Sequence, residues 1–286
     1  MQGGSELEFV LPDLRFVPVG SLMPHERSDP QRLPPLVKRI RENAVLKNPV
    51  VVAPLPGDAA DERFVVLDGA NRVAAVGAAG LPHLVVQVVA YEPPAVELRT
   101  WYHALAGLDR DEIAKACRTI AGLECRAESE LHARALIARR DALAYAAFPD
   151  GTVTAFTGGR DLQEHNQLLN AIVDLYRDHH GFYRMSTDSL ALARSRYPEV
   201  TALLVFPHFE PAEVMELATG GELMPAGITR HLIRWRALRV NIAIDQLADT
   251  RHGLEEKNRW LREWLQERLA MRQVRFYEES TVLFDE

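Results

Sequence analysis

The sequence has few cysteines, no long apolar run and no excess of basic residues. Among its 286 residues, Cys117 and Cys125 are the only cysteines, too few for a disulfide framework or, by themselves, for a zinc site. We therefore expect two free thiols in a reducing cytoplasm. No apolar run approaches the roughly 18 residues that cross a bilayer. Residues 1–10 carry two acids and no basic cluster, unlike a secretory signal, so we expect a cytoplasmic protein without a membrane segment.

The balance of charge argues against a nucleic-acid partner. The formal net charge is −7 at pH 7, whereas proteins that wrap DNA usually carry a basic excess that contacts phosphates. The apolar fraction of 47% and the charged fraction of 26% are ordinary for a globular protein, so extended disorder is not expected. The length allows one large domain or two ordinary ones.

Short apolar strands alternate with helices in the first part of the chain. Strands are predicted at residues 15–19, 48–53, 63–67 and 84–89, and helices at about 31–40 and at 70–79. Pro34 and Pro35 fall in the first turn of the earlier helix, where proline is tolerated. Residues 1–108 are therefore predicted to form a domain with α/β or α+β architecture.

The pattern changes after residue 108. Helices are predicted at 111–123, 161–179 and 254–271, strands at 201–206, 274–277 and 281–284, and a hairpin at 142–156. The hairpin is predicted because alternating runs flank the turn sequence Pro-Asp-Gly. No repeat or low-complexity linker separates the two parts. Residues 109–286 are therefore expected to form a second, α+β domain packed on the first, with an active site in the cleft between them.

The most informative motif is Asp68-Gly69-Ala70-Asn71-Arg72, which lies between a predicted strand and a predicted helix. A helix N-terminus attracts anions, and glycine lets the backbone approach a ligand closely. Arg72 supplies a forked donor for phosphate, and Asp68 could hold a magnesium ion or a ribose hydroxyl. The alternative is structural, with Asp68 capping the helix and Arg72 in solvent.

This motif resembles the signature loop of the ParB/sulfiredoxin superfamily. The stretch Leu-Lys-Asn-Pro-Val-Val-Val at residues 46–52 and the helix before it are similar to that superfamily's preceding helix, loop and strand. The resemblance covers about residues 12–105 and implies a ParB/sulfiredoxin-like nucleotide-binding domain. It does not by itself imply one activity, because members include DNA-partition proteins, sulfiredoxins and kinases of free L-serine.

Two of these activities fit the chain poorly. Ala70 stands where sulfiredoxins carry their cysteine, and sulfinic-acid chemistry needs a thiol at that place. A partition protein should have a helix-turn-helix after the nucleotide domain. Residues 112–114 resemble the start of one, but Arg118 occupies the place of the expected turn glycine.

The free serine kinases, including the type that supplies phosphoserine for siderophore assembly, fit best. They have a glutamate before the first long helix in a context similar to His25-Glu26. Their second domain has a stretch similar to Pro-Ala-Gly-Ile-Thr-Arg-His at residues 225–231, and the chain end at 274–277 is also similar. The resemblance thus extends over most of the protein and implies a kinase that transfers a phosphoryl group from ATP or ADP, with Mg²⁺, to free L-serine, giving O-phospho-L-serine.

The resemblance also implies roles for single residues. Glu26 is the candidate base that takes the serine hydroxyl proton. The loop from Gly69 to Arg72 would hold the phosphates, with Asp68 on magnesium. Lys47 would reach the terminal phosphates as a point charge. Left to local pattern alone, Glu26 is an exposed loop acid and Lys47 a solvated lysine.

The serine would be held by residues 229–231 from the second part of the chain, with two residues just past the last strand of the first domain beside them. Thr229, Arg230 and His231 follow a Pro-Ala-Gly turn that could direct donors at the serine carboxylate, and Trp101 and His103 would line the pocket. The alternatives are an edge-strand arginine, a surface histidine and, for Trp101, plain core packing.

Two other functions remain open at this point. The first is a ParB-like, nucleotide-dependent DNA-binding regulator, which would bind a cytidine nucleotide and retain DNA in a salt-sensitive way. The second is a degenerate sensor that binds nucleotide and serine without chemistry. The sequence does not distinguish ATP from ADP, because the loop reads phosphates rather than their number.

Overall fold

The computed structural model describes residues 11–42, 45–56, 62–177 and 181–277, and the chain divides into two units. Unit 1 contains the chain up to Leu22, residues Pro30–Ala90 and the chain from Ile233 onward. Unit 2 contains Met23–Asp29 and Tyr91–Leu232. This division differs from the predicted domains 1–108 and 109–286, because a short early segment joins unit 2 and the last segment returns to unit 1.

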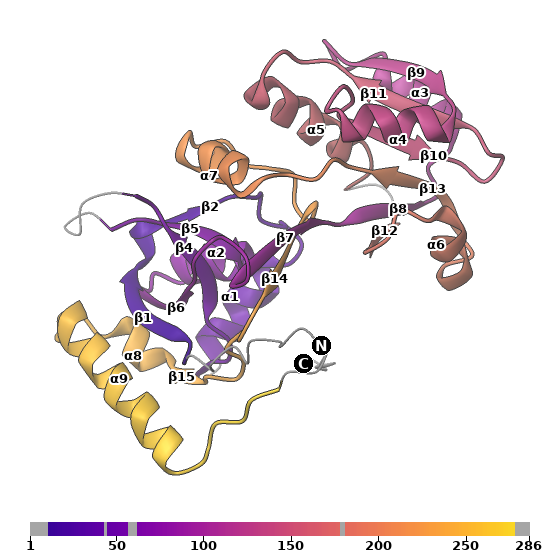
Figure 1. Ribbon diagram of the computed structural model, residues 1–286. Coiled ribbons are helices and arrows are strands. Elements are labelled where there is room, and N and C mark those ends of the chain that lie inside the picture. Colours follow the sequence, from indigo (N-terminus) through magenta and orange to yellow (C-terminus); the bar gives the residue numbers. More distant parts are fainter. Residues whose placement is uncertain (1–10, 43–44, 57–61, 178–180, 278–286) are drawn as a thin grey trace, which may run out of the picture. The chain divides into compact units, whose positions relative to one another are not determined.

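Unit 1 is built on a five-stranded mixed sheet with strand order β1-β6-β4-β5-β2 (Figure 1). The strands are β1 (Asp13–Pro18), β4 (Val50–Pro54), β5 (Phe64–Asp68), β6 (His83–Val88) and the edge strand β2 (Leu22–Pro24), of which only Leu22 is assigned to unit 1. Strand β4 runs parallel to β6 and antiparallel to β5. The apolar runs of these strands are buried, as expected for central strands covered on both faces.

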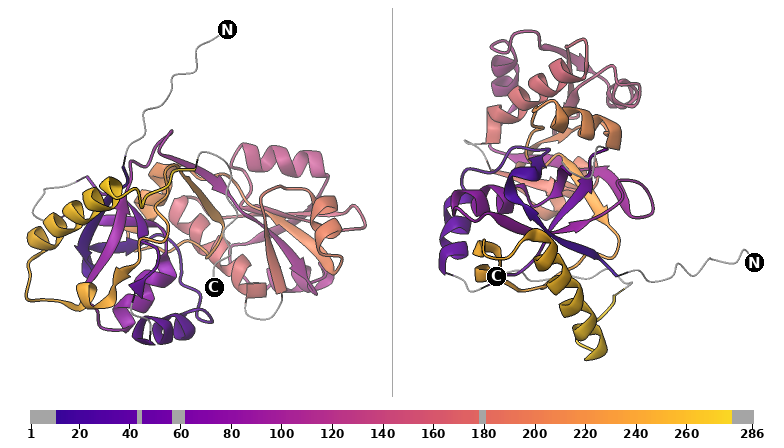
Figure 2. Two further views of the ribbon diagram at one scale, coloured as in Figure 1. Left: turned by 90° about the horizontal axis from the view of Figure 1, so that it is seen from below. Right: turned by 90° about the vertical axis from the view of Figure 1, so that its left-hand side faces the viewer.

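Helices and two short strands complete unit 1. They are α1 (Leu33–Glu42), α2 (Ala70–Ala78), α8 (Ile244–Ala248), α9 (Leu254–Ala270), the 3₁₀ turn Val19–Ser21, β3 (Val45–Leu46) and β15 (Ile242–Ala243). Figure 2 shows α9 lying along β1. There Asn258 exchanges two hydrogen bonds with the Phe16 backbone, and Trp260 packs on the Phe16 ring with centroids 6.1 Å apart. The C-terminal helix therefore belongs to the core of unit 1.

Unit 2 contains a six-stranded antiparallel sheet with strand order β12-β8-β13-β10-β11-β9. The strands are β8 (Tyr102–Ala106), β9 (Glu124–Glu128), β10 (Ala144–Ala147), β11 (Val153–Thr157), β12 (Gly181–Met185) and β13 (Val200–Val205). A separate pair is formed by β7 (Val96–Thr100) and β14 (Thr229–Ile233). The helices are α3 (Arg110–Cys117), α4 (Glu130–Ala138), α5 (Leu162–Arg177), α6 (Leu190–Arg196) and α7 (Pro211–Thr219).

Helices cover both faces of this sheet. Alternate residues of each strand point to opposite faces, so Leu204 packs with α5 whereas its neighbour Leu203 packs in a separate cluster with α4 and α6. The continuous apolar run predicted as a buried strand is β13, and its burial on both faces explains why it lacks alternation. The predicted α/β (α+β) class is confirmed.

Several boundaries differ from the predicted ones. The hairpin is confirmed as β10 and β11, with Gly151 at φ +83° in its turn. The helix predicted at 111–123 ends at Cys117. Residues 274–277 form no strand, so that prediction was wrong. The strand predicted at 281–284 and the end of the helix predicted at 161–179 lie outside the described residues.

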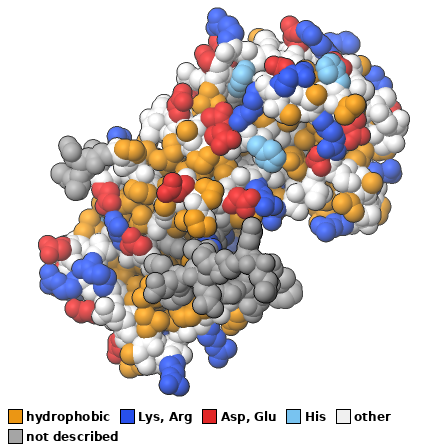
Figure 3. Space-filling model, in the orientation of Figure 1, with side chains coloured by type: hydrophobic (Ala, Val, Ile, Leu, Met, Phe, Trp, Pro, Cys, Tyr) orange, Lys and Arg blue, Asp and Glu red, His pale blue; other side chains and the backbone are white. Residues whose placement is uncertain are grey.

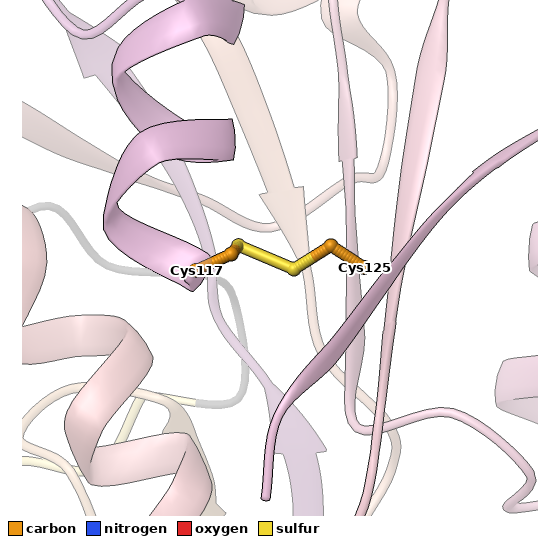
Figure 4. The surroundings of a disulfide bond; sticks show 2 residues. All are labelled: Cys117 and Cys125. Atoms are coloured by element: carbon orange, nitrogen blue, oxygen red, sulfur yellow. A yellow bond between two sulfur atoms is a disulfide. The ribbon is translucent and has the colours of Figure 1, made fainter. Parts of the chain in front are cut away.

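The two cysteines form a disulfide (Figure 4), so the prediction of free thiols was wrong. Cys117 ends α3 and Cys125 lies in β9, and their Cα atoms are 6.6 Å apart, within the range that a disulfide bridges. The chain reverses direction between the two cysteines. Two cysteines in a sequence do not by themselves predict such a reversal, so the disulfide was not expected. None of the helices in the described ranges is long and apolar enough to cross a membrane.

Candidate active site

The predicted phosphate loop of unit 1 joins β5 to α2. Asp68 is the last residue of β5, opposite Val51 of β4. Gly69 follows with φ +109°, a left-handed conformation that glycine adopts without penalty. A Cβ at Gly69 would lie 3.0 Å from both Arg72 and Val50. Helical bonding begins at once, because the Val73 N–H donates to the Gly69 carbonyl at 3.0 Å.

Arg72 holds this loop together. Its Nη1 donates to the carbonyls of Asn48 at 3.0 Å and Pro49 at 2.5 Å, and its Nη2 donates to Asp68 Oδ2 at 2.6 Å. The side chain is 21% exposed, so the alternative of an arginine in solvent does not apply. The contacts tie the strand end to the segment that precedes β4, which shapes the surface on which an anion would rest.

A second arginine on Asp68 was missed by the sequence analysis. Arg236 Nη2 donates to Asp68 Oδ2 at 2.5 Å. The arginine is placed by Gln87 of β6, which is buried and bonds the Trp235 carbonyl at 3.1 Å and the Ala237 N–H at 2.9 Å. The sequence contains one indication of this contact, which is Gln87 inside the apolar run of β6. A buried glutamine side chain needs hydrogen-bond partners.

The other predicted nucleotide residues lie in the same unit. Ala70 and Asn71 form the first turn of α2, where Ala70 is buried. A helix leaves its first N–H groups without partners inside the helix, which suits phosphate oxygens. Lys47 lies next to Asn48, whose carbonyl Arg72 holds, and the Lys47 carbonyl accepts from the Asn241 N–H at 3.1 Å. Lys47 is thus close in the fold to the loop.

A metal ion at this loop would depend on Asp68. In the part of the chain that the structure describes, no group of three or more histidine, cysteine or acidic side chains could hold a metal. Magnesium that binds with a nucleotide takes one or two carboxylates and completes its shell with phosphate oxygens and water. A single carboxylate at the end of β5 fits that requirement.

Glu26 lies in the segment Met23–Asp29, which belongs to unit 2. Its carboxylate Oε2 accepts a hydrogen bond from the Gly227 N–H at 2.8 Å. The backbone on either side of Glu26 is held by Met224, which receives from Arg27 N–H at 2.9 Å and donates to the His25 carbonyl at 2.8 Å. Glu26 is therefore not a loose loop acid, and its carboxylate is held at one oxygen.

A polar cluster surrounds this segment. His25 is buried, and its Nε2 lies 2.8 Å from Thr229 Oγ1. The His25 and His231 rings meet edge to face at 5.1 Å, and Tyr91 Oη lies 2.7 Å from His231 Nε2. Burial holds the pKa of His231 well below its usual value, and the charge of a protonated His25 would lower this pKa further. His231 is therefore neutral near pH 7 and is not the surface histidine of the alternative interpretation.

Arg230 is the cation of this cluster. Its guanidinium lies over the Trp101 ring, 4.3 Å from the centroid, and Trp101 is only partly buried. The Trp101 N–H donates to the Ile228 carbonyl at 2.8 Å, which ties the two segments together. A cation stacked on an indole face is held in place without losing its charge, so Arg230 can still bind a carboxylate.

His103 does not resemble a pocket-lining residue. It is fully buried on β8, its Nδ1 lies 2.6 Å from Tyr176 Oη, and its Nε2 lies 2.9 Å from the Gly227 carbonyl. Burial lowers the pKa of His103 to about 4. Both ring nitrogens are engaged inside the protein, so the geometry disagrees with the expectation that this side chain touches substrate.

The predicted residues thus form two groups, and each group is assembled within one unit. Unit 1 holds Lys47 and the loop from Asp68 to Arg72, to which Arg236 is added. Unit 2 holds Glu26, Trp101, His103, Thr229, Arg230 and His231. The expectation of a cleft site between two domains stays a prediction.

No family model matches this chain. An ATP-dependent L-serine kinase of Staphylothermus marinus is 36% identical over 92 residues, which span 32% of this chain and 35% of that relative. The ADP-dependent L-serine kinase SerK of Thermococcus kodakarensis is 22% identical over 243 residues, spanning 82% of this chain and 93% of its own. The ATP-dependent L-serine kinase SbnI of Staphylococcus aureus is 23% identical over 278 residues, spanning 96% and 97%.

Solved structures of free serine kinases share this fold. A free serine kinase in complex with AMP superposes with a TM-score of 0.69 at 20% identity, covering 86% of this chain and 98% of that one. SbnI from Staphylococcus aureus with a C-terminal truncation gives 0.66 at 22% identity, covering 90% and 96%. This chain therefore has the fold of the free serine kinases and is similar in sequence to curated L-serine kinases, both ATP-dependent and ADP-dependent.

Proposed function

We propose that this protein transfers a phosphoryl group from ATP or ADP to the hydroxyl of free L-serine, giving O-phospho-L-serine. The observation that carries the proposal is the Glu26 carboxylate, held by the Gly227 N–H at 2.8 Å beside the His25, Thr229 and His231 cluster. The fold shared with free serine kinases and the similarity to curated L-serine kinases support it.

Glu26 acts in this proposal as the general base. A carboxylate that accepts one N–H bond on Oε2 keeps its other oxygen for the serine hydroxyl. It orients that hydroxyl and takes its proton as the oxygen attacks the phosphorus. The hydrogen bond from Gly227 keeps the carboxylate in one orientation, which an unattached loop acid would not have.

The nucleotide phosphates rest on the loop Gly69 to Arg72 at the N-terminus of α2. Backbone N–H groups there bind the phosphate oxygens, and Lys47 and Arg236 add positive charge. Asp68 would hold Mg²⁺, which neutralises charge on the phosphates when it is bound. Arg72 contributes mainly by keeping Asp68 and residues 48–49 in place.

Free serine is recognised by its carboxylate and its ammonium. Arg230, stacked on Trp101, binds the carboxylate, and Thr229 supplies a hydroxyl within the same strand. His231 is neutral because its pKa is held well below the usual value by burial, so it takes part as a hydrogen-bonding group rather than as a second cation. A neutral imidazole there avoids repulsion of the serine ammonium.

The donor and the compartment are part of the same proposal. The relatives include both ATP-dependent and ADP-dependent kinases, so the donor is decided by experiment. We infer a cytoplasmic location because the reaction needs a nucleotide and a free amino acid. The free thiols do not support it, because Cys117 and Cys125 form a disulfide. The Cys117–Cys125 disulfide is a feature that is rare in cytosolic proteins of mesophiles and commoner in those of hyperthermophiles.

Phosphorus NMR tests the proposal directly. Purified protein with Mg²⁺ and either ATP or ADP should produce a phosphoserine resonance only when L-serine is added.

The Glu26→Gln variant should lose at least about 100-fold in turnover, since general-base catalysis contributes about 10²–10⁴-fold, while nucleotide binding stays near normal. Glu216→Gln is the matched control, because Glu216 is an exposed acid of α7 in the same unit. A Glu26→Gln variant with most of its activity would remove Glu26 from this role.

The alternatives predict different results. Helix α3 is followed by strand β9 in place of a recognition helix, and Figure 3 shows acidic and basic side chains interspersed on the face in view. Neither observation favours the DNA-binding regulator. A ligand sensor would be stabilised by nucleotide and serine together and yet form no phosphoserine with either donor.

A further inference from the structure

A line of hydrogen bonds connects helix α5 to Glu26 within unit 2. Tyr176 of α5 contacts His103 Nδ1 at 2.6 Å, and His103 Nε2 contacts the Gly227 carbonyl at 2.9 Å. The N–H of the same glycine donates to Glu26 Oε2 at 2.8 Å. The first two of these three hydrogen bonds are buried, and Tyr176 and His103 are both 0% exposed.

The direction of each hydrogen bond follows from chemistry. The Gly227 carbonyl can only accept, so His103 carries its proton on Nε2. Nδ1 is then an acceptor, and the Tyr176 hydroxyl donates to it. This assignment requires a neutral imidazole, which agrees with the lowered pKa of the buried His103. Every polar atom of the pair is satisfied in this single arrangement.

Gly227 is the point where the line meets the base. Its φ of +80° is left-handed, and a Cβ there would fall 2.2 Å from the Arg184 guanidinium. Its carbonyl and its N–H belong to neighbouring peptide groups that share one Cα. Only φ and ψ of Gly227 separate the two groups, so holding the carbonyl through His103 restricts the directions that the N–H on Glu26 can take.

Other side chains of α5 hold the same two segments. Asn170 Nδ2 donates to the Leu223 carbonyl at 2.8 Å. Arg27, next to Glu26, pairs with Asp174 at 2.8 Å, and Arg177 donates to the Ser28 carbonyl at 2.8 Å. Helix α5 thus supports the segment of Glu26 on one side and the turn of Gly227 on the other.

We propose that His103 and Tyr176 are positioning residues that orient Glu26 through Gly227, rather than residues that contact serine. The inference rests on the proposed function, because it assigns Glu26 the role of base. A base displaced by about 1 Å costs as much as 100-fold in rate. Such a loss falls on kcat, while binding of nucleotide and serine is little changed.

The test compares two buried tyrosines of unit 2. Tyr176→Phe removes the hydroxyl that donates to His103. Tyr145→Phe is the matched control, because the Tyr145 hydroxyl is buried and has no hydrogen-bond partner among the described residues. For the full chain we expect kcat to fall about tenfold or more in Tyr176→Phe, with KM values for serine and nucleotide within about twofold. Exchange of the Gly227 amide proton, followed by NMR, should become faster in Tyr176→Phe and stay unchanged in Tyr145→Phe.

The outcomes separate this inference from the function on which it rests. An active wild type whose kcat is unaltered by Tyr176→Phe would overturn the positioning role and leave the kinase standing. An equal loss of kcat in both variants would also overturn it, since general loosening of the core would then be the cause. A wild type that forms no phosphoserine with ATP or ADP would overturn the proposed function, and the inference with it.

Discussion

Asp68 interacts with two arginines, one from its own loop and one from a segment 168 residues further along the chain. Each ion pair is partly exposed, so neither contributes much to stability. Their consequence is local, since Arg72 and Arg236 bring positive charge to the end of β5. A phosphate bound at the N-terminus of α2 would lie within reach of Arg236.

Replacing Arg236 should therefore weaken nucleotide binding more than it weakens the fold. For Arg236→Gln we expect the Kd of the nucleotide to rise about tenfold, which corresponds to about 1.4 kcal/mol, a typical contribution for a charged hydrogen bond to phosphate. Calorimetric titration measures it. Arg251→Gln is the matched control, because Arg251 also pairs with an aspartate, Asp249, in unit 1. Equal affinities in both variants would exclude Arg236 from the phosphate site.

At the scale of elements, helix α2 has one glycine at its N-cap and one inside it, and the two have opposite requirements. Gly69 is the N-cap, with φ +109°, and a Cβ added there would lie only 3.0 Å from side-chain atoms of Arg72 and Val50. Gly77 lies inside the helix, and a Cβ added there would lie 3.8 Å from Val19. The first glycine serves the loop, and the second only weakens the helix.

Alanine at these two positions should have opposite effects on stability. Gly69→Ala is expected to lower the free energy of unfolding by about 1–3 kcal/mol, since it forces a left-handed conformation and a close contact, and to weaken nucleotide binding. Gly77→Ala should raise it by about 0.5–1 kcal/mol. Urea unfolding with and without nucleotide gives both numbers. A Gly69→Ala variant as stable as Gly77→Ala would show that the loop does not need glycine.

For the whole molecule, two histidines link stability to pH, the fully buried His103 and the partly buried His231. Burial lowers the pKa of His103 to about 4 and holds that of His231 well below its usual value. An unfolded histidine takes up a proton below about pH 6.5, so the unfolded state binds more protons than the folded state between pH 6.5 and about 4. The contribution of these two histidines to the free energy of unfolding is therefore fully present above pH 6.5. It is lost as the pH falls through this window.

We expect the free energy of unfolding to drop by about 2 kcal/mol or more between pH 7 and pH 4.5. Urea titrations across this range measure the slope. His103→Gln should reduce the slope, whereas His208→Gln should keep it, because His208 is exposed and contacts the Thr100 hydroxyl. A flat profile in the wild type would mean that His103 and His231 do not stay neutral in the folded state.

The sequence by itself determined those parts of the protein that depend on neighbours in the chain. The strand, Gly69 and helix α2 follow from an apolar run, a glycine and small residues in succession, and the hairpin at β10 and β11 follows from its turn residues. These features are set by local sterics and periodicity, which act over a few residues. The residues of the candidate site were instead assigned from the resemblance to the free serine kinases, and their roles stay predictions.

Only the tertiary structure decided what those residues contact. Glu26 meets Gly227 across 201 positions, His103 turns inward to Tyr176, and Arg236 reaches Asp68. Residues 23–29 and the chain from Ile233 onward join units that their place in the sequence does not suggest. Hydrogen bonds and burial between distant segments depend on how the sheets and helices pack, and no local pattern encodes that packing.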